Sequence, residues 1–294
     1  MKSILIFSVC LFLYTLVQAN TDEIRIIYII HADGNYLFHN EEGDPLNAAE
    51  RMLSQSIFVG ENIKNGEVLI FYQKPAENFL FFFPEDNGEF YYYKNGIKIL
   101  DESYSRKDSS GFDSESSLLK KYSDPSYNNF RTVLLYYGHE IPLNDTSGYS
   151  QSQPAKEFGL NIFKEGIKQV FDSISSHKKF DMIVLSTCKN GNNKTAEELS
   201  PFADYLVGSP AEIHLSYLNS ESLIKLSREG DLTAKEMAAE FAENAYNIMS
   251  QTVSTEVSIS IFDLNKDVEK TPKDSNERIT NLYRPAMFGR KIIH

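Results

Sequence analysis

Short apolar runs and amphipathic stretches alternate along most of the chain. The runs are typical of strands buried inside a sheet, and the stretches between them have helical spacing. Because the order is strand, helix, strand, it predicts a parallel sheet flanked by helices. The predicted strands are 24–30, 67–73, 131–137, 180–185, 205–208 and 257–262, and the predicted helices are 45–64, 156–175, 195–202, 220–228 and 233–249.

An aromatic segment in the first half of the chain has turn residues where a helix would otherwise be expected. Residues 79–83, 89–93 and 97–100 are predicted strands separated by Asn-Gly turns, which favours hairpins. We expect them to form a small antiparallel flap beside the main sheet. The Ser-, Asp- and Glu-rich residues 101–117 predict a loop, and residues 117–127 predict a short helix.

Residues 1–19 have the three parts of a secretory signal peptide. Lys2 gives a positive start, residues 4–13 are apolar, and residues 17–19 fit the small-x-small cleavage rule. The apolar run is shorter than the roughly 20 residues that span a membrane. We therefore expect a secreted or periplasmic protein that is not inserted in the membrane after signal removal.

The remaining chain predicts one α/β domain over residues 20–264 and a polar C-terminal extension over 265–294. The net charge of −12 argues against nucleic acid as a partner, because nucleic-acid binding favours a basic face. We expect no cofactor and no metal. No EF-hand spacing supports calcium, and His31 with Asp33 gives too few ligands for a metal site, so loop capping is the favoured role.

Cys188 follows the apolar strand 180–185 and precedes a Lys-Asn-Gly turn. The carboxyl end of a central strand faces the crevice where open α/β sheets bind ligands. If residues 1–19 are removed, Cys188 is the one cysteine left, so it cannot form an internal disulfide. A lone cysteine in an exported protein indicates a reactive thiol or an intermolecular bridge, although a buried packing role is also common.

His139 follows the predicted strand 131–137, about fifty residues before Cys188. Parallel strands end at the same edge of a sheet, so the two side chains are expected to meet there. An imidazole can deprotonate a nearby thiol, which then attacks a carbonyl carbon. The backbone N–H groups of Cys188 and Glu140 are candidate donors to the resulting oxyanion.

These residues resemble the clostripain-like cysteine peptidases of the caspase-like clan. Residues 179–188 follow the family's strand motif that ends in Asp-Ala-Cys, and residues 202–209 resemble its Tyr-Ala-Asp-Tyr-Leu-Val-x-Ser segment. Residues 32–37 are similar to its opening Ala-Asp-Asn-Asn-Leu. The resemblance touches residues 24–230 in several short segments. It implies a caspase-like sandwich, an α/β fold with a mostly parallel central sheet flanked by helices.

The resemblance also implies site roles. His139 and Cys188 match the catalytic pair, and the substrate is a peptide or protein. Ser186, which stands where the family has an acidic residue that selects basic side chains, is assigned with Asp33 to the substrate pocket. Ser186 cannot pair with a basic residue, so that preference does not transfer. Maturation by clipping suggests Lys156 as a self-cleavage point.

Three functions are compatible with the pattern. The favoured one is peptide-bond hydrolysis by the His139 and Cys188 dyad through a thioester. Glu140 stands where the family has glycine, and this departure, with Ser186, favours an alternative: a catalytically inactive protein that binds a peptide or a partner. A third is another thiol enzyme, such as an amidase or a transpeptidase.

Overall fold

We analysed a computed structural model of the chain. The structure describes residues 23–32, 37–39, 45–74, 77–79, 83–85, 87–105, 111–123, 130–144, 158–174, 178–212, 220–229, 232–252, 256–266 and 279–285.

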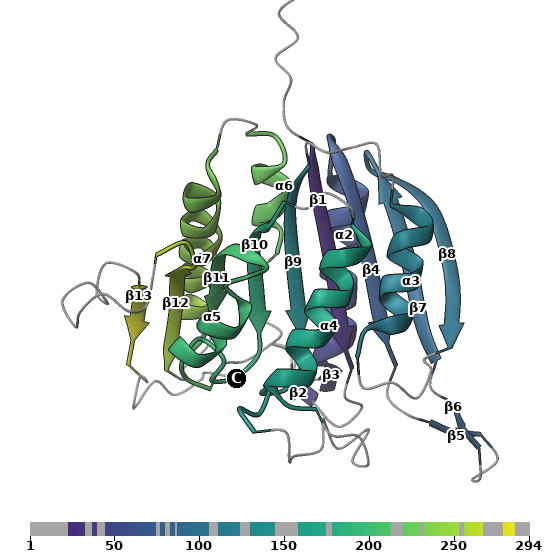
Figure 1. Ribbon diagram of the computed structural model, residues 1–294, viewed down its shortest axis with the longest axis horizontal. Helices are drawn as coiled ribbons and strands as arrows, with labels where there is room; N and C mark the ends of the chain where they lie inside the picture. Colours follow the sequence, from purple (N-terminus) through teal and green to yellow (C-terminus); the bar gives the residue numbers. More distant parts are fainter. Residues whose placement is uncertain are drawn as a thin grey trace, which may run out of the picture.

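Nine strands of the described residues form one sheet (Figure 1). Their order across the sheet is β13-β12-β11-β10-β9-β1-β4-β7-β8. The five strands from β11 to β4 in this order run parallel, and the two at each edge are antiparallel to their inner neighbours. The strands are β1 (Ile24–His31), β4 (Gly66–Gln73), β7 (Asn87–Lys94), β8 (Ile97–Ser105), β9 (Arg131–Tyr137), β10 (Phe180–Ser186), β11 (Ala203–Gly208), β12 (Val257–Asp263) and β13 (Ile279–Arg284).

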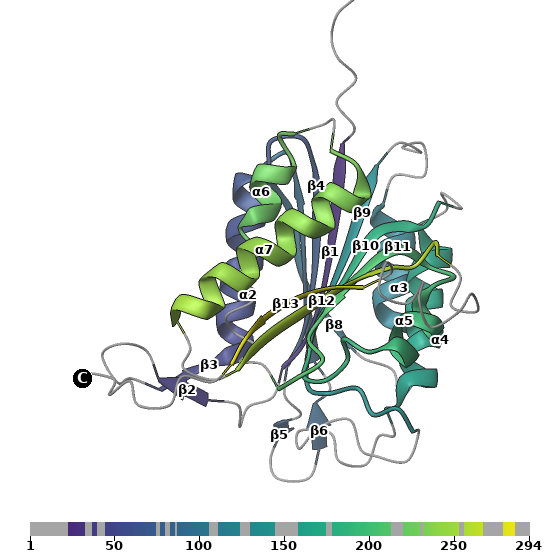
Figure 2. The same ribbon diagram turned by 90° about the vertical axis from the view of Figure 1, so that its left-hand side faces the viewer.

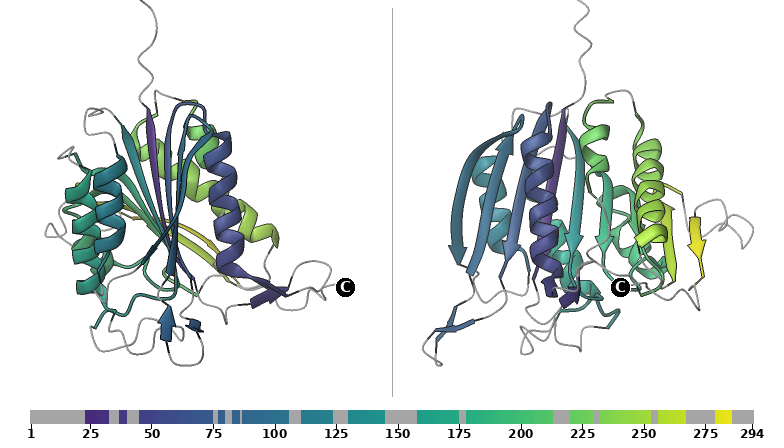
Figure 3. Two further views of the ribbon diagram at one scale, coloured as in Figure 1. Left: turned by 90° about the vertical axis from the view of Figure 1, so that its right-hand side faces the viewer. Right: turned by 180° about the vertical axis from the view of Figure 1, so that it is seen from behind.

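Helices cover both faces of this sheet, which makes a three-layer sandwich (Figures 2 and 3). One face carries α2 (Ala48–Asn62), α6 (Ser222–Leu226) and α7 (Ala234–Thr252). The other carries α3 (Asp113–Tyr122), α4 (Leu160–Ser173) and α5 (Asn193–Leu199). Two small hairpins, β2 (Leu37–His39) with β3 (Pro45–Asn47) and β5 (Glu77–Phe79) with β6 (Phe83–Glu85), lie apart from the sheet. The predicted α/β fold class is confirmed.

The central strands are apolar on both faces because both faces are packed against helices. Along β1, Ile26, Tyr28 and Ile30 lie in the core layer under α2, α6 and α7. Ile27 and Ile29 point the other way, into the layer under α3, α4 and α5. The alternation of side chains along a strand therefore builds two cores from one continuous apolar run.

Side-chain caps determine where two of the helices begin. The predicted capping box of α7 is present: the Thr233 N–H donates to Glu236 Oε2 at 2.8 Å, and the Glu236 N–H donates to Thr233 Oγ1 at 3.2 Å. The predicted start of the first helix at Pro45 is wrong. Asn47 caps α2 by accepting from the Ala49 N–H at 2.8 Å, so the helix begins three residues later.

Most of the aromatic segment, β7 and β8, belongs to the main sheet, which corrects the predicted flap for residues 89–93 and 97–100; the ends of the predicted strand 79–83 lie in the separate β5–β6 hairpin. β7 pairs with β4 and β8 pairs with β7, because Phe90 and Tyr93 are fully buried and complete the core layers. The predicted loop 101–117 contains the end of β8 and the start of α3. β13 lies inside the predicted extension 265–294 and contributes an edge strand to the sheet.

None of the helices in the described part of the chain is long and apolar enough to cross a membrane.

A buried ion pair joins β1 to β4 near their amino ends. Arg25 and Glu67 are register partners, are about 1% and 0% exposed, and their side chains form a direct ion pair. The Tyr92 hydroxyl donates to the second Glu67 oxygen at 3.0 Å, and the Arg25 guanidinium lies over the Phe130 ring. The pair therefore connects three strands in a region that excludes water.

The substitution Glu67→Gln tests this connection. It leaves the Arg25 charge buried without a counter-charge, so the free energy of unfolding should fall by about 3–5 kcal/mol. Urea denaturation monitored by circular dichroism measures the change. Asp101→Asn, which breaks an exposed ion pair with Lys98, is the control and should leave the midpoint nearly unchanged. A loss below about 1 kcal/mol for Glu67→Gln would contradict the account.

Candidate active site

The two predicted catalytic residues follow adjacent parallel strands. In the pairing of β9 with β10, Tyr137 is opposite Ser186, and His139 and Cys188 each lie two residues beyond this pair. The Gly138 N–H continues the ladder by donating to the Ser186 carbonyl at 3.4 Å. The prediction that these two strands end side by side is confirmed. The contact between the imidazole and the thiol stays a prediction.

Both side chains are half-buried. Cys188 is the free cysteine of the described residues, and it packs against the core layer under α2, α6 and α7. His139 begins the turn that leaves β9. A thiol at the border of the core is partly shielded from water yet remains reachable from outside, which suits a nucleophile as well as a packing residue.

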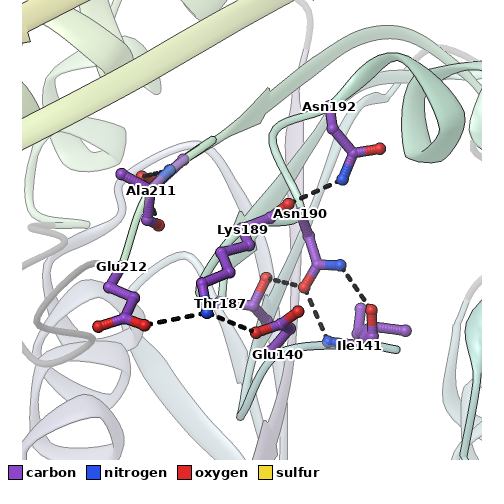
Figure 4. Close-up of polar contacts among 9 residues, drawn as sticks. Glu140, Ile141, Thr187, Lys189, Asn190, Asn192, Ala211 and Glu212 are labelled. Atoms are coloured by element: carbon purple, nitrogen blue, oxygen red, sulfur yellow. Dashed lines mark hydrogen bonds and ion pairs between the residues drawn. The ribbon is translucent and has the colours of Figure 1, made fainter. Parts of the chain in front are cut away.

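A buried amide joins two turns: residues 138–141 after β9, the histidine turn, and residues 187–191 after β10, the cysteine turn (Figure 4). The Asn190 side chain is 1% exposed, and its Oδ1 accepts from the Ile141 N–H and from the Thr187 hydroxyl, both at 2.8 Å. Its Nδ2 donates to the Ile141 carbonyl at 2.8 Å. Ile141 lies two residues after His139, and Thr187 precedes Cys188. One side chain therefore contacts the backbone of the histidine turn and the flank of the cysteine turn.

Lys189 makes a second, exposed connection between the same turns. Its ammonium group lies 3.4 Å from a Glu140 carboxylate oxygen and 2.9 Å from one of Glu212 (Figure 4). Glu212 and then Glu140 raise the pKa of Lys189, so the lysine stays charged. All three side chains are about half exposed or more, so solvent weakens these ion pairs.

Glu140 fits its position without backbone strain. Among the described residues, the non-glycine residues with positive φ are Asn95 and Lys189, so Glu140 does not occupy the conformation that favours glycine. Its side chain extends to Lys189. The glycine that the clostripain-like family has at this position is therefore not required by the backbone of this turn.

The cysteine turn is also fixed to the segment that follows β11. The Lys189 N–H donates to the Ala211 carbonyl at 3.0 Å, and the Gly191 N–H donates to the Ser209 carbonyl at 2.8 Å. A Cβ on Gly191 would lie 2.5 Å from the Gly208 carbonyl oxygen, so only glycine permits this close approach. The turn is thus held on both sides by neighbouring strand ends.

The other predicted site residues have different outcomes. Ser186 is fully buried at the end of β10. Asp33 and Lys156 lie outside the described residues. The substrate-pocket assignment of Ser186 and Asp33 and the self-cleavage assignment of Lys156 stay predictions.

His31 is a core residue, which corrects its predicted role as a loop cap. It is the last residue of β1, is 3% exposed, and packs among the rings of Phe112, Tyr136 and Phe158. Its Nδ1 lies 3.0 Å from the Tyr136 hydroxyl. In the part of the chain that the structure describes, no group of three or more His, Cys, Asp or Glu side chains could hold a metal ion.

The sequence places Asn190 in the turn that ends the strand but does not reveal its role, because its partner Ile141 lies 49 residues away. The local signal was a small polar cluster directly after a buried strand. Such a cluster indicates a turn but does not specify which distant backbone a side chain will contact.

A mostly parallel sheet lies between two helical layers, and a histidine and a cysteine follow adjacent strands; solved structures of C11 cysteine proteases have the same fold. The clostripain family model matches residues 156–287, and these include the cysteine turn. The resemblance to clostripain-like cysteine peptidases is therefore confirmed. A comparison with curated proteins finds no match.

Solved structures share the fold. A secreted C11 cysteine protease from Bacteroides thetaiotaomicron, in complex with an irreversible peptide inhibitor, is 15% identical with a TM-score of 0.58. The match covers 83% of this chain and 66% of that chain. An inactive zymogen C11 protease from Parabacteroides distasonis is 17% identical with a TM-score of 0.52, covering 85% and 64%. The chain thus spans just under two thirds of the length of both proteins.

The substitution Gly191→Ala tests the packing of the cysteine turn. The added methyl group would force the turn away from the Gly208 backbone, so the free energy of unfolding should fall by about 1–3 kcal/mol. Thermal and urea denaturation measure the change. Asn193→Ala, at an exposed position two residues on, is the matched control and should have little effect. An equal, small effect of both substitutions would show that the turn is not tightly packed.

Proposed function

We propose that this protein is an exported cysteine endopeptidase that cleaves peptide bonds with the dyad His139 and Cys188. The observation that supports it most is the register of β9 and β10, because it brings the two turns to one edge of the sheet. The fold shared with C11 cysteine proteases supports the same function.

The chemistry follows from the residue types. His139 takes the proton of the Cys188 thiol, and the thiolate attacks the substrate carbonyl carbon. The N–H groups of Cys188 and Glu140 stabilise the oxyanion. His139 then gives its proton to the leaving amine, and a thioester remains on Cys188. Water, deprotonated by His139, attacks the thioester, releases the acid product and restores the thiol.

Peptides are the proposed substrates, because the Bacteroides thetaiotaomicron structure holds a peptide inhibitor. Ser186 and Asp33 are proposed for the substrate pocket and Lys156 for self-cleavage, as the resemblance implies. Export rests on the signal-peptide pattern of residues 1–19 and on the description of that relative as secreted.

The alternative is an inactive protein of the same fold that binds a peptide or a partner. Its support in the sequence is that Glu140 and Ser186 replace family residues. The ordinary backbone conformation of Glu140 and its ion pair with Lys189 weaken the first argument, because the side chain has a place outside the turn. We therefore favour the peptidase.

Alkylation of the thiol tests the dyad. Iodoacetamide should label Cys188 rapidly near neutral pH, and His139→Ala should slow the labelling, because the ordinary thiol is mostly protonated there. A fluorogenic peptide library should be cleaved by the mature protein, with hydrolysis lowered by about 10²–10⁴-fold in His139→Ala. Cys188→Ala is the negative control. Slow labelling in both wild type and His139→Ala would support the inactive alternative.

A further inference from the structure

We propose that Asn190 is a positioning residue for the dyad: its buried amide sets the histidine turn against the cysteine turn, so that the imidazole meets the thiol. This inference rests on the proposed function. It concerns the activation of the thiol, which can be measured without any peptide substrate.

The amide makes a two-point contact with the histidine turn. Beyond Tyr137, β9 has ended, and the Ile141 N–H and carbonyl lie outside the sheet's ladder. Asn190 binds both groups at 2.8 Å, which substitutes for a strand partner at this point. Two hydrogen bonds to one residue restrict both the distance and the rotation of the segment, and His139 lies two residues before it.

The orientation of the amide is set by the Ile141 N–H and carbonyl, and the Thr187 hydroxyl adds a third hydrogen bond. Oδ1 receives two donors, the Ile141 N–H and the Thr187 hydroxyl, while Nδ2 faces the Ile141 carbonyl. With the amide reversed, its NH₂ group would face the Ile141 N–H, and its oxygen would face the carbonyl. The network therefore permits one orientation. Since Thr187 precedes Cys188, this hydrogen bond extends the connection to the nucleophile's neighbour.

Burial makes this the stronger of the two connections between the turns. Asn190 and Thr187 are about 1% and 0% exposed, so water cannot replace the hydrogen bonds when they are lost. The Lys189 to Glu140 ion pair spans the same turns but is about half exposed. A displacement of about 1 Å between reacting groups can cost about 10²-fold in rate, so a small relaxation here would be measurable.

The test is the pH profile of Cys188 alkylation by iodoacetamide in the full mature protein. In the wild type, His139 should keep alkylation fast at pH 6–7, below the ordinary thiol pKa of about 8.5. Asn190→Ala should lower the rate at pH 6.5 by about 10- to 100-fold and move the profile toward that of His139→Ala. The variant that combines Asn190→Ala with His139→Ala should be alkylated no more slowly than His139→Ala alone, because Asn190 acts through the imidazole.

Three further variants separate positioning from stability. Thr187→Val removes one hydroxyl without changing the side-chain shape and should shift the profile in the same direction. Thr187→Ser keeps the hydroxyl and should restore the wild-type profile. Asn192→Ala removes the cap of α5 and the 2.7 Å hydrogen bond to the Lys189 carbonyl, and in the part of the chain that the structure describes these contacts lie away from the histidine turn. It should destabilise the protein and leave the profile in place.

The outcomes are decisive. A folded Asn190→Ala protein with the wild-type pH profile would overturn the inference. So would a double variant whose loss of alkylation rate is the product of the losses in Asn190→Ala and His139→Ala. If Asn190→Ala does not fold, the two Thr187 variants decide: the inference requires that Thr187→Val shifts the pH profile and that Thr187→Ser does not. A wild-type profile independent of His139 would overturn both the dyad and its positioning. If Cys188 alkylation depends on both His139 and Asn190 but no peptide is hydrolysed, the result would support the inference and contradict the proposed function.

Discussion

The parallel pairing of β9 with β10 is the constraint on which the rest of the site depends. Tyr137 and Ser186 are the last register partners, and the chain leaves the sheet on both strands at the same level. A slip of one residue would turn the side chains of a strand to the opposite faces. Since both faces are buried, the two cores fix the register, and the register fixes where His139 and Cys188 begin their turns.

Beyond the sheet, polar contacts replace the strand ladder. Hydrogen bonds from Lys189 and Gly191 fix the cysteine turn to the segment after β11, and Asn190 fixes it to the histidine turn. The buried contacts come from short side chains and backbone groups, whereas the exposed ones come from Lys189 and the glutamates. The two kinds of contact suit a reactive pair. The buried contacts fix the positions of the two turns, and the exposed charges remain available to solvent and ligands.

The sequence was most informative where burial alone decides the structure. The strand 131–137 agrees with β9 residue for residue, and the strand before Cys188 differs from β10 by one residue, because long apolar runs have few other places in a sandwich. Exposed edges were harder to predict. The start of β8 was predicted as a strand, but its second half, residues 101–105, is mostly polar and exposed, so that part resembles a loop until its neighbour β7 is known.

Long-range polar contacts were not predictable in the same way. The placement of the two turns followed from strand order, but the Asn190 contact joins residues 49 apart and has no local pattern. His31 stands directly before a predicted turn, yet the aromatic rings around it come from β9 and from the segments that precede α3 and α4, and these are assembled only in the fold.

The central claim is that the imidazole of His139 meets the thiol of Cys188. A crystal structure of the mature protein with a peptidyl chloromethyl ketone bonded to Cys188 Sγ tests it most directly. The account predicts a His139 ring nitrogen within hydrogen-bond reach of the reacting group, about 3–4 Å, directly or through one water. A structure in which His139 points away from the adduct, or in which the reagent is bonded elsewhere, would contradict it.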